Sequence, residues 1–458
     1  MNSQKLENFI FDKMSETNLP GVSLRLIKDG EVLISKGFGF RNIEDGLSST
    51  DNTLYGIGSI TKSFTAISIM QLKERGELDT EDPVKKYLPL EIEPKGEPIR
   101  IKHLLTHSSG IPALAYAESS IRRTVGAGEN WTPISDVEDM MNFVSGAGDW
   151  VHSKPGARWF YLNEGYVLLG AIIAKCSGSR YEEFVKENIL SPLGMDKTFF
   201  DLEKIKCNED AAVPYVLTKD GDQIPSKYTS GAISADGALI SNVVDLSYYL
   251  QMYLNKGKLD GNRIVTKESL REMESYRVPT PSIEGPFGKS TYGYGLRITE
   301  DFFGHQLIGH GGSVLVSTGY VGFIPEENTG ISILANGSGY PLSHLGMYGL
   351  ALVLGRNREE CPFIHRELAL KELEGVYETY HGTMSAEVKK TGDLMEIKIE
   401  NKYTKNTTLL IPEEIGKSKR QFYYLDGCNK IPVDFDITED GIELIFERYA
   451  LRKIGELT

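Results

Sequence analysis

Ser59 and Lys62, three positions apart, are the residues whose types and spacing best suit catalysis. On one face of a helix, residues at i and i+3 lie within reach of each other. An amine beside a hydroxyl can take its proton, so that the serine oxygen attacks a carbonyl carbon and forms an ester intermediate. A Ser-x-x-Lys pattern alone is expected about once by chance in a chain this rich in both residues. Its surroundings therefore carry more weight.

The residues around Ser59 predict that it lies at the buried start of a helix. A short extended run, residues 54–58, precedes it, and a mostly apolar helix follows from Phe64 to Leu72 and ends at Gly76. At a helix N-terminus, free amides and the positive end of the macrodipole favour negative charge. This setting favours acyl transfer through the Ser59 oxygen.

Tyr161 and Asn163 form a second motif, just before an apolar helix predicted over residues 165–176. A phenol loses its proton more readily beside a charged amine, so Tyr161, near a charged Lys62, could relay the Ser59 proton. The Asn163 amide offers both a donor and an acceptor to a substrate. The alternative, which the pattern alone favours, is a core tyrosine beside an N-cap asparagine.

The third motif is His310-Gly311-Gly312-Ser313. Two glycines let a substrate backbone lie close to a strand edge, and the Ser313 amide could join the Ser59 amide in an oxyanion hole. His310 would lie beside the nucleophile as an electrostatic or proton-relay group. Taken alone, the motif is equally consistent with a turn at the start of a strand.

The elements that must position these residues fall into a helix-rich middle flanked by strands. This order predicts one antiparallel sheet assembled from both ends, with a mainly helical region beside it and a cleft between them. Asp29-Gly30, between the first two predicted strands, is a strong hairpin turn signal. The predicted helices cover residues 5–18, 101–106, 137–143, 165–176, 181–189, 243–254 and 345–354, and the predicted strands cover 22–27, 32–38, 292–298, 306–309, 314–324 and 330–336.

Beyond a charged, irregular stretch at residues 356–362, the pattern is nearly all strand. Short strands separated by turn signals, the last over residues 442–448, predict a small antiparallel barrel of about 90 residues. We therefore expect a catalytic domain at residues 1–358, a linker at 359–366 and a β-barrel domain at 367–458.

Composition narrows the possible partners. With 458 residues and a net charge of -14, the chain is a poor match for nucleic acid or an anionic membrane. The N-terminus lacks the apolar core of a signal peptide, which predicts a cytoplasmic protein. His103 and His107 have metal-ligand spacing but no acidic or Cys partner nearby, and the four cysteines are far apart, so no metal or other cofactor is expected.

In order and spacing, the three motifs resemble the class C β-lactamase-related serine hydrolases. That group includes penicillin-binding D,D-peptidases, D-aminopeptidases and family VIII esterases. Residues 55–58, 104–112 and 292–296 add to the resemblance, which covers roughly residues 10–350. Lys390-Thr391-Gly392 also matches a motif of penicillin-binding proteins, but it falls at a predicted hairpin turn in the barrel and is interpreted as coincidence.

The resemblance implies an α/β fold, an antiparallel sheet flanked by helices with an all-helical subdomain. It also implies Ser59 as nucleophile, with Lys62 and Tyr161 as the base. The layout is similar to archaeal serine peptidases with a C-terminal lipocalin-like domain. His310 stands where true β-lactamases usually have lysine, which weakens recognition of a substrate carboxylate by a fixed positive charge.

We therefore expect a serine hydrolase that forms an acyl-enzyme at Ser59 and cleaves small peptides or amides, including those with D-residues. Asn163 and His310 would position the substrate, and the Ser59 and Ser313 amides would hold the oxyanion. A carboxylesterase is the nearest alternative, followed by a β-lactamase and by a non-catalytic ligand-binding protein. Exposed strand edges in the barrel predict a homo-oligomer.

Overall fold

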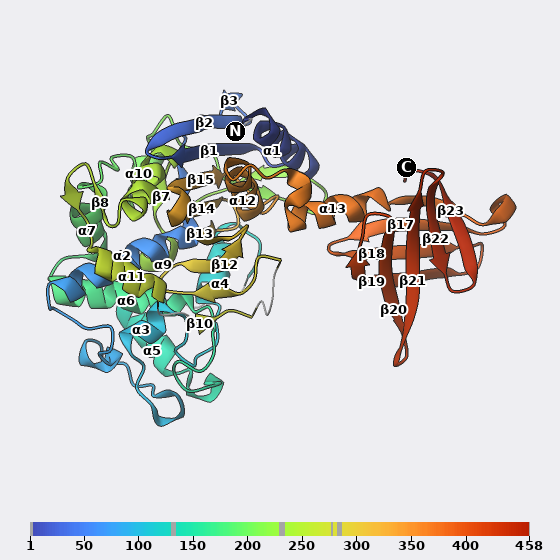
Figure 1. Ribbon diagram of the computed structural model, residues 1–458. Coiled ribbons are helices and arrows are strands. Elements are labelled where there is room, and N and C mark those ends of the chain that lie inside the picture. The colour runs from blue at the N-terminus through green and yellow to red at the C-terminus, as the bar shows by residue number, and fades with distance from the viewer. Residues whose placement is uncertain (1–2, 130–133, 229–233, 276–277, 282–285, 458) are drawn as a thin grey trace. The chain divides into compact units, whose positions relative to one another are not determined.

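The computed structural model describes residues 3–129, 134–228, 234–275, 278–281 and 286–457 (Figure 1). The chain forms two compact units, Met1–Gly355 and Arg356–Thr458. The range expected for a linker, residues 359–366, contains the start of helix α13 (Pro362–Glu372). Each unit is described below by itself.

An antiparallel sheet forms the centre of the first unit, and nine of its strands lie in the described residues. Val22 pairs with Ala335, so strands from the two ends of the unit lie side by side, as predicted. The hairpin predicted around Asp29 and Gly30 is present, and both residues have positive φ. In spatial order the strands are β10 (Val278–Pro279), β11 (Ser290–Tyr292), β12 (Arg297–Phe302), β13 (His305–Ser313), β14 (Thr318–Ile324), β15 (Thr329–Ala335), β1 (Gly21–Lys28), β2 (Glu31–Asn42) and β3 (Leu47–Ser48).

The described residues form thirteen α-helices, twelve of them in the first unit. They are α1 (Ser3–Thr17), α2 (Thr61–Glu74), α3 (Ile101–Leu105), α4 (Tyr116–Thr124), α5 (Val137–Ser145), α6 (Asn163–Ser177), α7 (Tyr181–Val185), α8 (Leu202–Lys206), α9 (Ser234–Gly237), α10 (Val243–Leu254), α11 (Lys267–Ser275), α12 (Leu342–Val353) and α13 in the second unit. Three short strand pairs, β4 (Tyr55–Gly56) with β7 (Ile240–Ser241), β5 (Tyr215–Leu217) with β6 (Gln223–Pro225) and β8 (Lys258–Leu259) with β9 (Asn262–Arg263), complete the unit.

Helices cover both faces of the sheet because successive strand residues point to opposite faces. On β15, Gly330 faces Leu250 of α10, whereas the next residue, Ile331, packs against α12. A Cβ on Gly349 of α12 would lie 2.6 Å from Ile331 Cδ1, so α12 packs closely against β15 at this position. The sheet is thereby buried on two sides.

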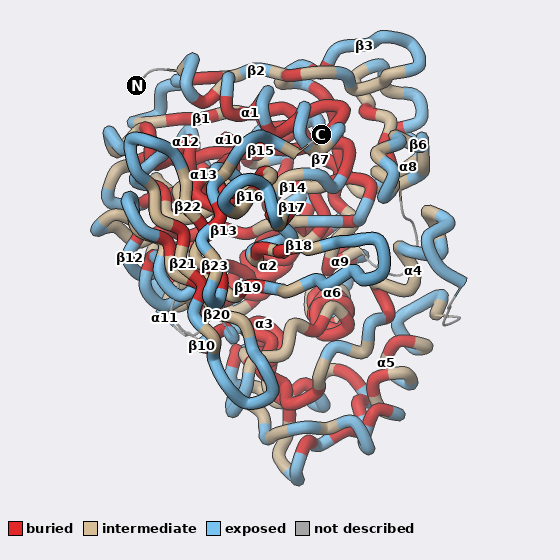
Figure 2. The backbone as a smooth tube through the Cα atoms, turned by 90° about the vertical axis from the view of Figure 1, so that its right-hand side faces the viewer, coloured by how far each residue is buried: buried red, intermediate tan, exposed pale blue. Residues whose placement is uncertain are grey.

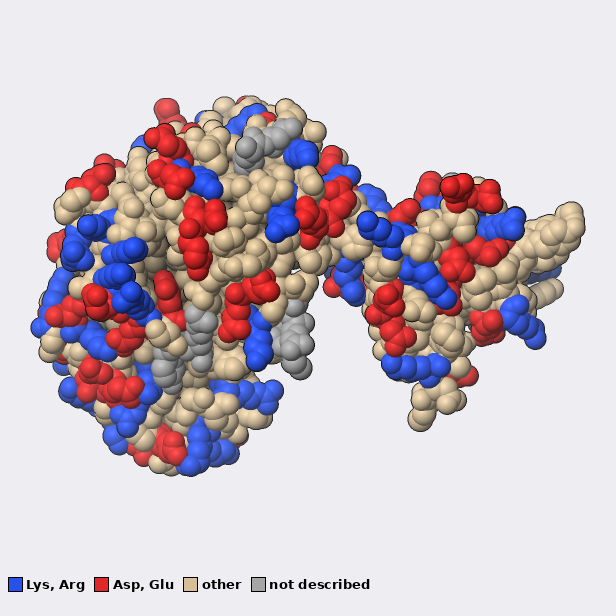
Figure 3. All heavy atoms as spheres, viewed as in Figure 1, with Lys and Arg blue, Asp and Glu red and all other residues tan. Residues whose placement is uncertain are grey.

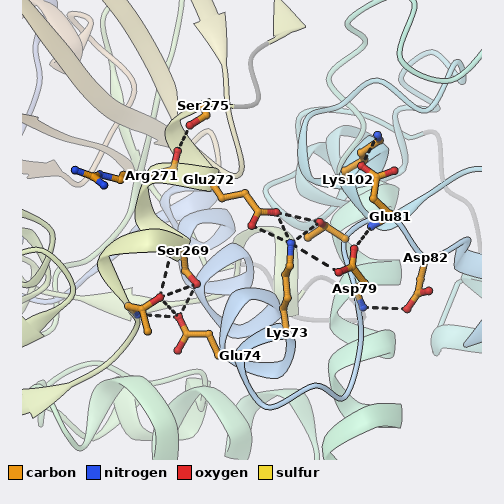
Figure 4. Close-up of polar contacts among 12 residues, drawn as sticks. Lys73, Glu74, Asp79, Glu81, Asp82, Lys102, Ser269, Arg271, Glu272 and Ser275 are labelled. Carbon is orange, nitrogen blue, oxygen red and sulfur yellow. Dashed lines mark hydrogen bonds and ion pairs between the residues drawn. The ribbon is translucent and has the colours of Figure 1, made fainter.

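Helix α2 runs through the core rather than along the surface. Every residue from Thr61 to Leu72 is buried, including the polar side chains of Ser63, Thr65 and Ser68, which donate hydrogen bonds within the protein (Figure 2). Its last turn emerges at Lys73, whose Nζ lies 2.6 and 2.9 Å from the two carboxylate oxygens of Glu272 on α11 (Figure 4). Polar contacts thus fix the far end of the helix whose first turn follows Ser59.

The strand predicted over residues 292–298 is instead two strands, β11 and β12. Residues between them form a turn in which Gly295 has a φ of 73°. A Cβ on Gly295 would lie 2.9 Å from the carbonyl oxygen of Lys62. The alternation of small and apolar residues was therefore misinterpreted, because it reflects a turn packed against α2.

The strand that carries His310 is longer than predicted. Strand β13 continues to Ser313, and it pairs His310 with Val321 and Ser313 with Thr318 on β14. The break lies at residues 314–317, so the prediction of a strand start at residue 314 was wrong. The interpretation of the motif as a turn at a strand start is likewise excluded.

The second unit is a closed antiparallel barrel, as predicted. Leu370 of α13 and Leu373, directly after this helix, pack into the core of the barrel. The buried Arg420 donates hydrogen bonds to the Ala369 carbonyl and to Glu372. The strand β23, which pairs with β16 and closes the barrel, was missed in the sequence. The strands are β16 (Gly375–Glu378), β17 (Ser385–Thr391), β18 (Leu394–Glu400), β19 (Lys405–Ile415), β20 (Lys419–Asp426), β21 (Asn429–Thr438), β22 (Gly441–Phe446) and β23 (Tyr449–Gly455).

Charged side chains of both signs intermingle on the face of the first unit shown in Figure 3, without an extended basic area on that face. Within the described residues, no helix combines the length and the apolar character that a bilayer crossing requires.

Candidate active site

Ser59 lies in a short 3-10 turn, Gly58–Ile60, that leads directly into α2. Gly58 has a φ of 52°, which a residue without a side chain adopts at little cost. Ser59 is partly exposed and lines a cleft of about 650 Å³. The predicted position of this serine at a helix start is confirmed.

Lys62 is fully buried and has three hydrogen-bond partners. Its Nζ lies 3.0 Å from Ser59 Oγ, 2.8 Å from Asn163 Oδ1 and 2.7 Å from the carbonyl oxygen of Asp236. None of these contacting atoms belongs to a carboxylate. In its neutral form, the amine would donate its two hydrogens to the two carbonyl oxygens and direct its lone pair at the serine hydroxyl.

The Tyr161 ring covers Lys62 on the cleft side. Lys62 Nζ lies 4.9 Å from the ring centroid, within cation–π range. The other face of the ring packs near His107, at 4.1 Å between centroids. Tyr161 is only partly buried and lines the cleft, so it is not a residue of the hydrophobic core.

Asn163 begins helix α6, and its side chain points to polar partners outside that helix. Oδ1 accepts the hydrogen bond from Lys62, and Nδ2 lies 3.1 Å from Glu118 Oε1. The N-cap residue of α6 is Leu162, without a side-chain cap. The alternative interpretation of Asn163 as an N-cap is therefore wrong.

The backbone of β13 lies directly against the turn that carries Ser59. A Cβ on Gly312 would lie 1.9 Å from the Ile57 carbonyl oxygen, and one on Gly58 would lie 2.7 Å from the Ser313 amide nitrogen. Gly312 is therefore required for contact with the turn that carries Ser59 rather than for contact with a substrate. A Cβ on Gly311 would meet only the Gly319 carbonyl, at an ordinary 3.8 Å.

His310 is buried at the cleft wall as a neutral ring. Its Nδ1 lies 2.5 Å from the Gly311 carbonyl, which can only accept, so Nδ1 carries the proton. Nε2 then accepts a hydrogen bond from the Tyr292 hydroxyl at 2.8 Å. Burial, followed by the charges of Arg297 and Lys62, lowers the pKa of His310 to about 3. His310 therefore supplies no fixed positive charge.

His103 and His107, which have the spacing of metal ligands, instead accept hydrogen bonds from backbone amides. His103 Nδ1 accepts from the amide of Arg100, and His107 Nδ1 accepts from the amide of Leu162 at 3.0 Å. Throughout the described part of the chain, no group of three or more His, Cys, Asp or Glu side chains is placed to hold a metal ion.

Comparison with known proteins agrees with this geometry. The profile of the Beta-lactamase family matches residues 6–354. The chain belongs to the beta-lactamase family. This family includes serine hydrolases. The second unit gives a separate match, because residues 357–452 match the profile named Pab87 octamerisation domain.

Three proteins that are similar to this chain cover different shares of it. A solved octameric penicillin-binding protein homologue from Pyrococcus abyssi is 47% identical, covers 99% of this chain and 100% of its own, and superposes with a TM-score of 0.92. Protein flp of Staphylococcus aureus is 26% identical over 340 residues, 73% of this chain, and this chain spans 63% of its length. D-amino acid amidase from Ochrobactrum anthropi, at 23% identity and a TM-score of 0.61, covers 77% of this chain and 98% of its own and shares the fold.

The structure of this beta-lactamase family member adds four cleft residues that sequence reasoning missed. Arg297, at the start of β12, lies 5.4 Å from the Trp159 ring, and Trp159 Nε1 is buried without a hydrogen bond to any described residue. Glu118 on α4 and Asp236 on α9 lie beside Asn163 and Lys62. These residues stand singly in short elements, so the sequence contains no spacing signal for them.

Proposed function

We propose that this protein is a serine hydrolase that forms an acyl-enzyme at Ser59 and cleaves amide bonds in small peptides. The observation that carries the proposal is the 3.0 Å contact between Ser59 Oγ and a fully buried Lys62 that touches no carboxylate in the described residues. Such an amine can take a proton, whereas a lysine paired with a carboxylate stays charged.

In the first half of the reaction, neutral Lys62 accepts the Ser59 proton directly or through the Tyr161 hydroxyl, and Oγ bonds to the substrate carbonyl carbon. The amides of Ser59 and Ser313 hold the oxygen that becomes negative, since β13 and the Ser59 turn are in contact. The C–N bond then breaks and the leaving amine takes the proton from Lys62. A water molecule attacks the ester by the same sequence, which releases the acid and restores Ser59.

The free edge of β13 supports a peptide substrate. Pairing between β12 and β13 ends at Arg297 and Gly309, so that, among the described strands, residues 310–313 pair only with β14. An extended peptide could add to this edge through its backbone. Asn163 and His310 would then position the acyl group, and Gly311 leaves space for it.

Arg297 favours a peptide over a simple ester. Because His310 is neutral, the guanidinium of Arg297 and the free Trp159 N–H are the groups on this side of the cleft that suit a carboxylate. A dipeptide or tripeptide has such a carboxylate on its leaving group, and a carboxylesterase substrate usually does not. β-Lactam hydrolysis would also use this charge and remains an outcome of the test below.

We also propose that the full chain is a homo-oligomer of eight copies. The second unit matches an octamerisation family, and the similar Pyrococcus abyssi protein is octameric. Light scattering of the full chain should give about eight times its 51.0 kDa mass. A monomer or dimer at micromolar concentration would contradict this proposal.

The enzymatic proposal is tested by incubating wild type and Ser59→Ala with D- and L-amino-acid amides, dipeptides, a p-nitrophenyl ester and a chromogenic cephalosporin. Turnover and intact mass are both followed. Ser68→Ala is the matched control, because Ser68 is on the same helix but its hydroxyl bonds only within it, to Phe64. Turnover and an acyl adduct should vanish in Ser59→Ala alone; survival of either there would contradict the proposal.

A further inference from the structure

Two carboxylate residues line the cleft on the side of Lys62 and Asn163. Glu118 lies 3.1 Å from Asn163 Nδ2, and Asp236 bonds to Lys62 through its backbone carbonyl. The short helix of Asp236 is held in place from below, since Thr65 of α2 donates to the Ala235 carbonyl at 2.6 Å. Hydrogen bonds thus link Asp236 to Ser59 through Lys62, and link Glu118 to Ser59 through Asn163 and then Lys62.

The Asp236 carboxylate has an oxygen that accepts no hydrogen bond from the described residues. Only 3% of the residue is exposed, and Oδ1 is buried without a hydrogen bond to any described residue. Buried carboxylate oxygens normally have partners, because desolvation without a hydrogen bond is unfavourable. An unpartnered acceptor at a cleft wall indicates that a donor arrives from outside the chain.

The charge around Asp236 also favours an incoming cation. Lys62, when protonated, favours the charged form of Asp236, whereas Glu118 and the buried Glu164 oppose it. Tyr116 and Tyr181 are also titratable groups near Asp236. Glu164 accepts a hydrogen bond from the Tyr116 amide and does not line the cleft. Burial, and then Glu164 and Glu118, raise the pKa of Asp236 to about 7. A bound ammonium would stabilise its charged form.

We propose that Glu118 and Asp236 bind the ammonium group on the acyl side of the substrate, so that the enzyme removes an N-terminal residue whose α-amine is free. This inference rests on the proposed function of Ser59. An α-ammonium lies only two bonds from the scissile carbonyl carbon. The carboxylates are correspondingly close to the nucleophile, through Asn163 on one side and Lys62 on the other.

The test compares phenylalanine amide with N-acetylphenylalanine amide, each in D and L forms. Glu118→Gln keeps an oxygen for Asn163 and loses the charge, and Asp236→Asn leaves the backbone carbonyl that Lys62 uses. Glu272→Gln is the control carboxylate, because Glu272 lies at the other end of α2. Wild type should prefer the free amine by about 10-fold or more, as a charged hydrogen bond implies. Both cleft variants should reduce that ratio toward one, and the control should not.

A second readout is the pH dependence of KM for the free amide. KM should fall as Asp236 ionises near pH 7 and rise again as the substrate amine, with an ordinary pKa of about 8, loses its proton. Asp236→Asn should remove the first change only. The control Glu272→Gln should retain both changes.

Two results would contradict the ammonium site alone, and a third would contradict the proposed hydrolase function. Equal or faster turnover of the acetylated amides, or a free-to-acetylated ratio unchanged in both cleft variants, would contradict the ammonium site while leaving the hydrolase intact. Absence of turnover on every substrate, together with failure of a fluorophosphonate to label Ser59, would instead contradict the proposed function and the ammonium site with it.

Discussion

Helix α2 has a lysine in its first turn and another in its last turn, and the two have different surroundings. Lys62 is fully buried and contacts a hydroxyl and two carbonyl oxygens. Lys73 is 26% exposed, lies 2.6 Å from a carboxylate oxygen of Glu272, and belongs to a network of ion pairs (Figure 4). The same amine is suited to moving a proton at one end and to holding two helices together at the other.

Lys62 and Lys73 differ in the groups that contact their amines: carbonyl and hydroxyl oxygens at Lys62, and a carboxylate at Lys73. A carboxylate at contact distance stabilises the ammonium form of a lysine, and Lys73 has such a partner in Glu272. At the first turn the acidic groups of Asp236 and Glu164 are near but do not touch the amine. Substitutions at the two ends of α2 therefore have separable consequences.

The largest effect is expected for Lys62→Met. Loss of the group that takes the Ser59 proton should lower kcat/KM on the best amide substrate by about 1,000-fold. Steady-state kinetics and burst-phase mass spectrometry measure this. Lys73→Met should stay within about twofold of wild type, since general acid–base effects come only from groups at the reacting atoms. Equal losses in both variants would remove the functional distinction between the two lysines.

The next effect separates the two glycines beside the nucleophile. Gly312→Ala places a Cβ 1.9 Å from the Ile57 carbonyl and must push β13 away from the Ser59 turn. We expect a loss of about 100-fold in kcat, the size of a lost oxyanion donor. Gly311→Ala is the matched variant, because its Cβ meets an ordinary contact, and it should mainly change KM. Kinetics of both variants, with circular dichroism to verify folding, decide the point.

A smaller effect concerns stability at acid pH. His310 is neutral in the fold, with a pKa of about 3, but takes up a proton near pH 6.5 when unfolded. Its contribution to stability is therefore lost as pH falls below 6.5, by about 2 kcal/mol at pH 5. His310→Gln should show that much less decline in unfolding free energy between pH 6.5 and 5, measured by urea denaturation. An unchanged decline would indicate that His310 is charged in the fold.

The smallest effect is expected for the ion pair at the end of α2. Lys73→Met removes a partly exposed pair and should lower the free energy of unfolding by about 1 kcal/mol or less. Because such pairs are screened by salt, the difference from wild type should shrink in 1 M NaCl. A loss of several kcal/mol that salt does not change would place Lys73 among the buried interactions.

The sequence was informative where a motif is local. The spacing of Ser59 and Lys62 follows from one turn of helix, and the Asp29-Gly30 hairpin follows from positive φ. Motif spacing also predicted that Tyr161 and Asn163 lie at the cleft with them. Strand ends were predicted less well. The alternation of small and apolar residues continues through a turn at Gly295, and β23 shows too little pattern of its own to distinguish it from the preceding strand.

By itself, then, the sequence determined the helix start at Ser59, the antiparallel sheet and the barrel, because periodicity and short motifs depend on neighbours along the chain. Only the tertiary structure decided that His310 is neutral, that Gly312 contacts the Ser59 turn, that Glu118 lies beside Asn163 and that Asp236 lies beside Lys62. These properties depend on burial and on charges from elements that are distant in the chain. A residue's charge and its partners are set by what packs around it, which no local pattern encodes.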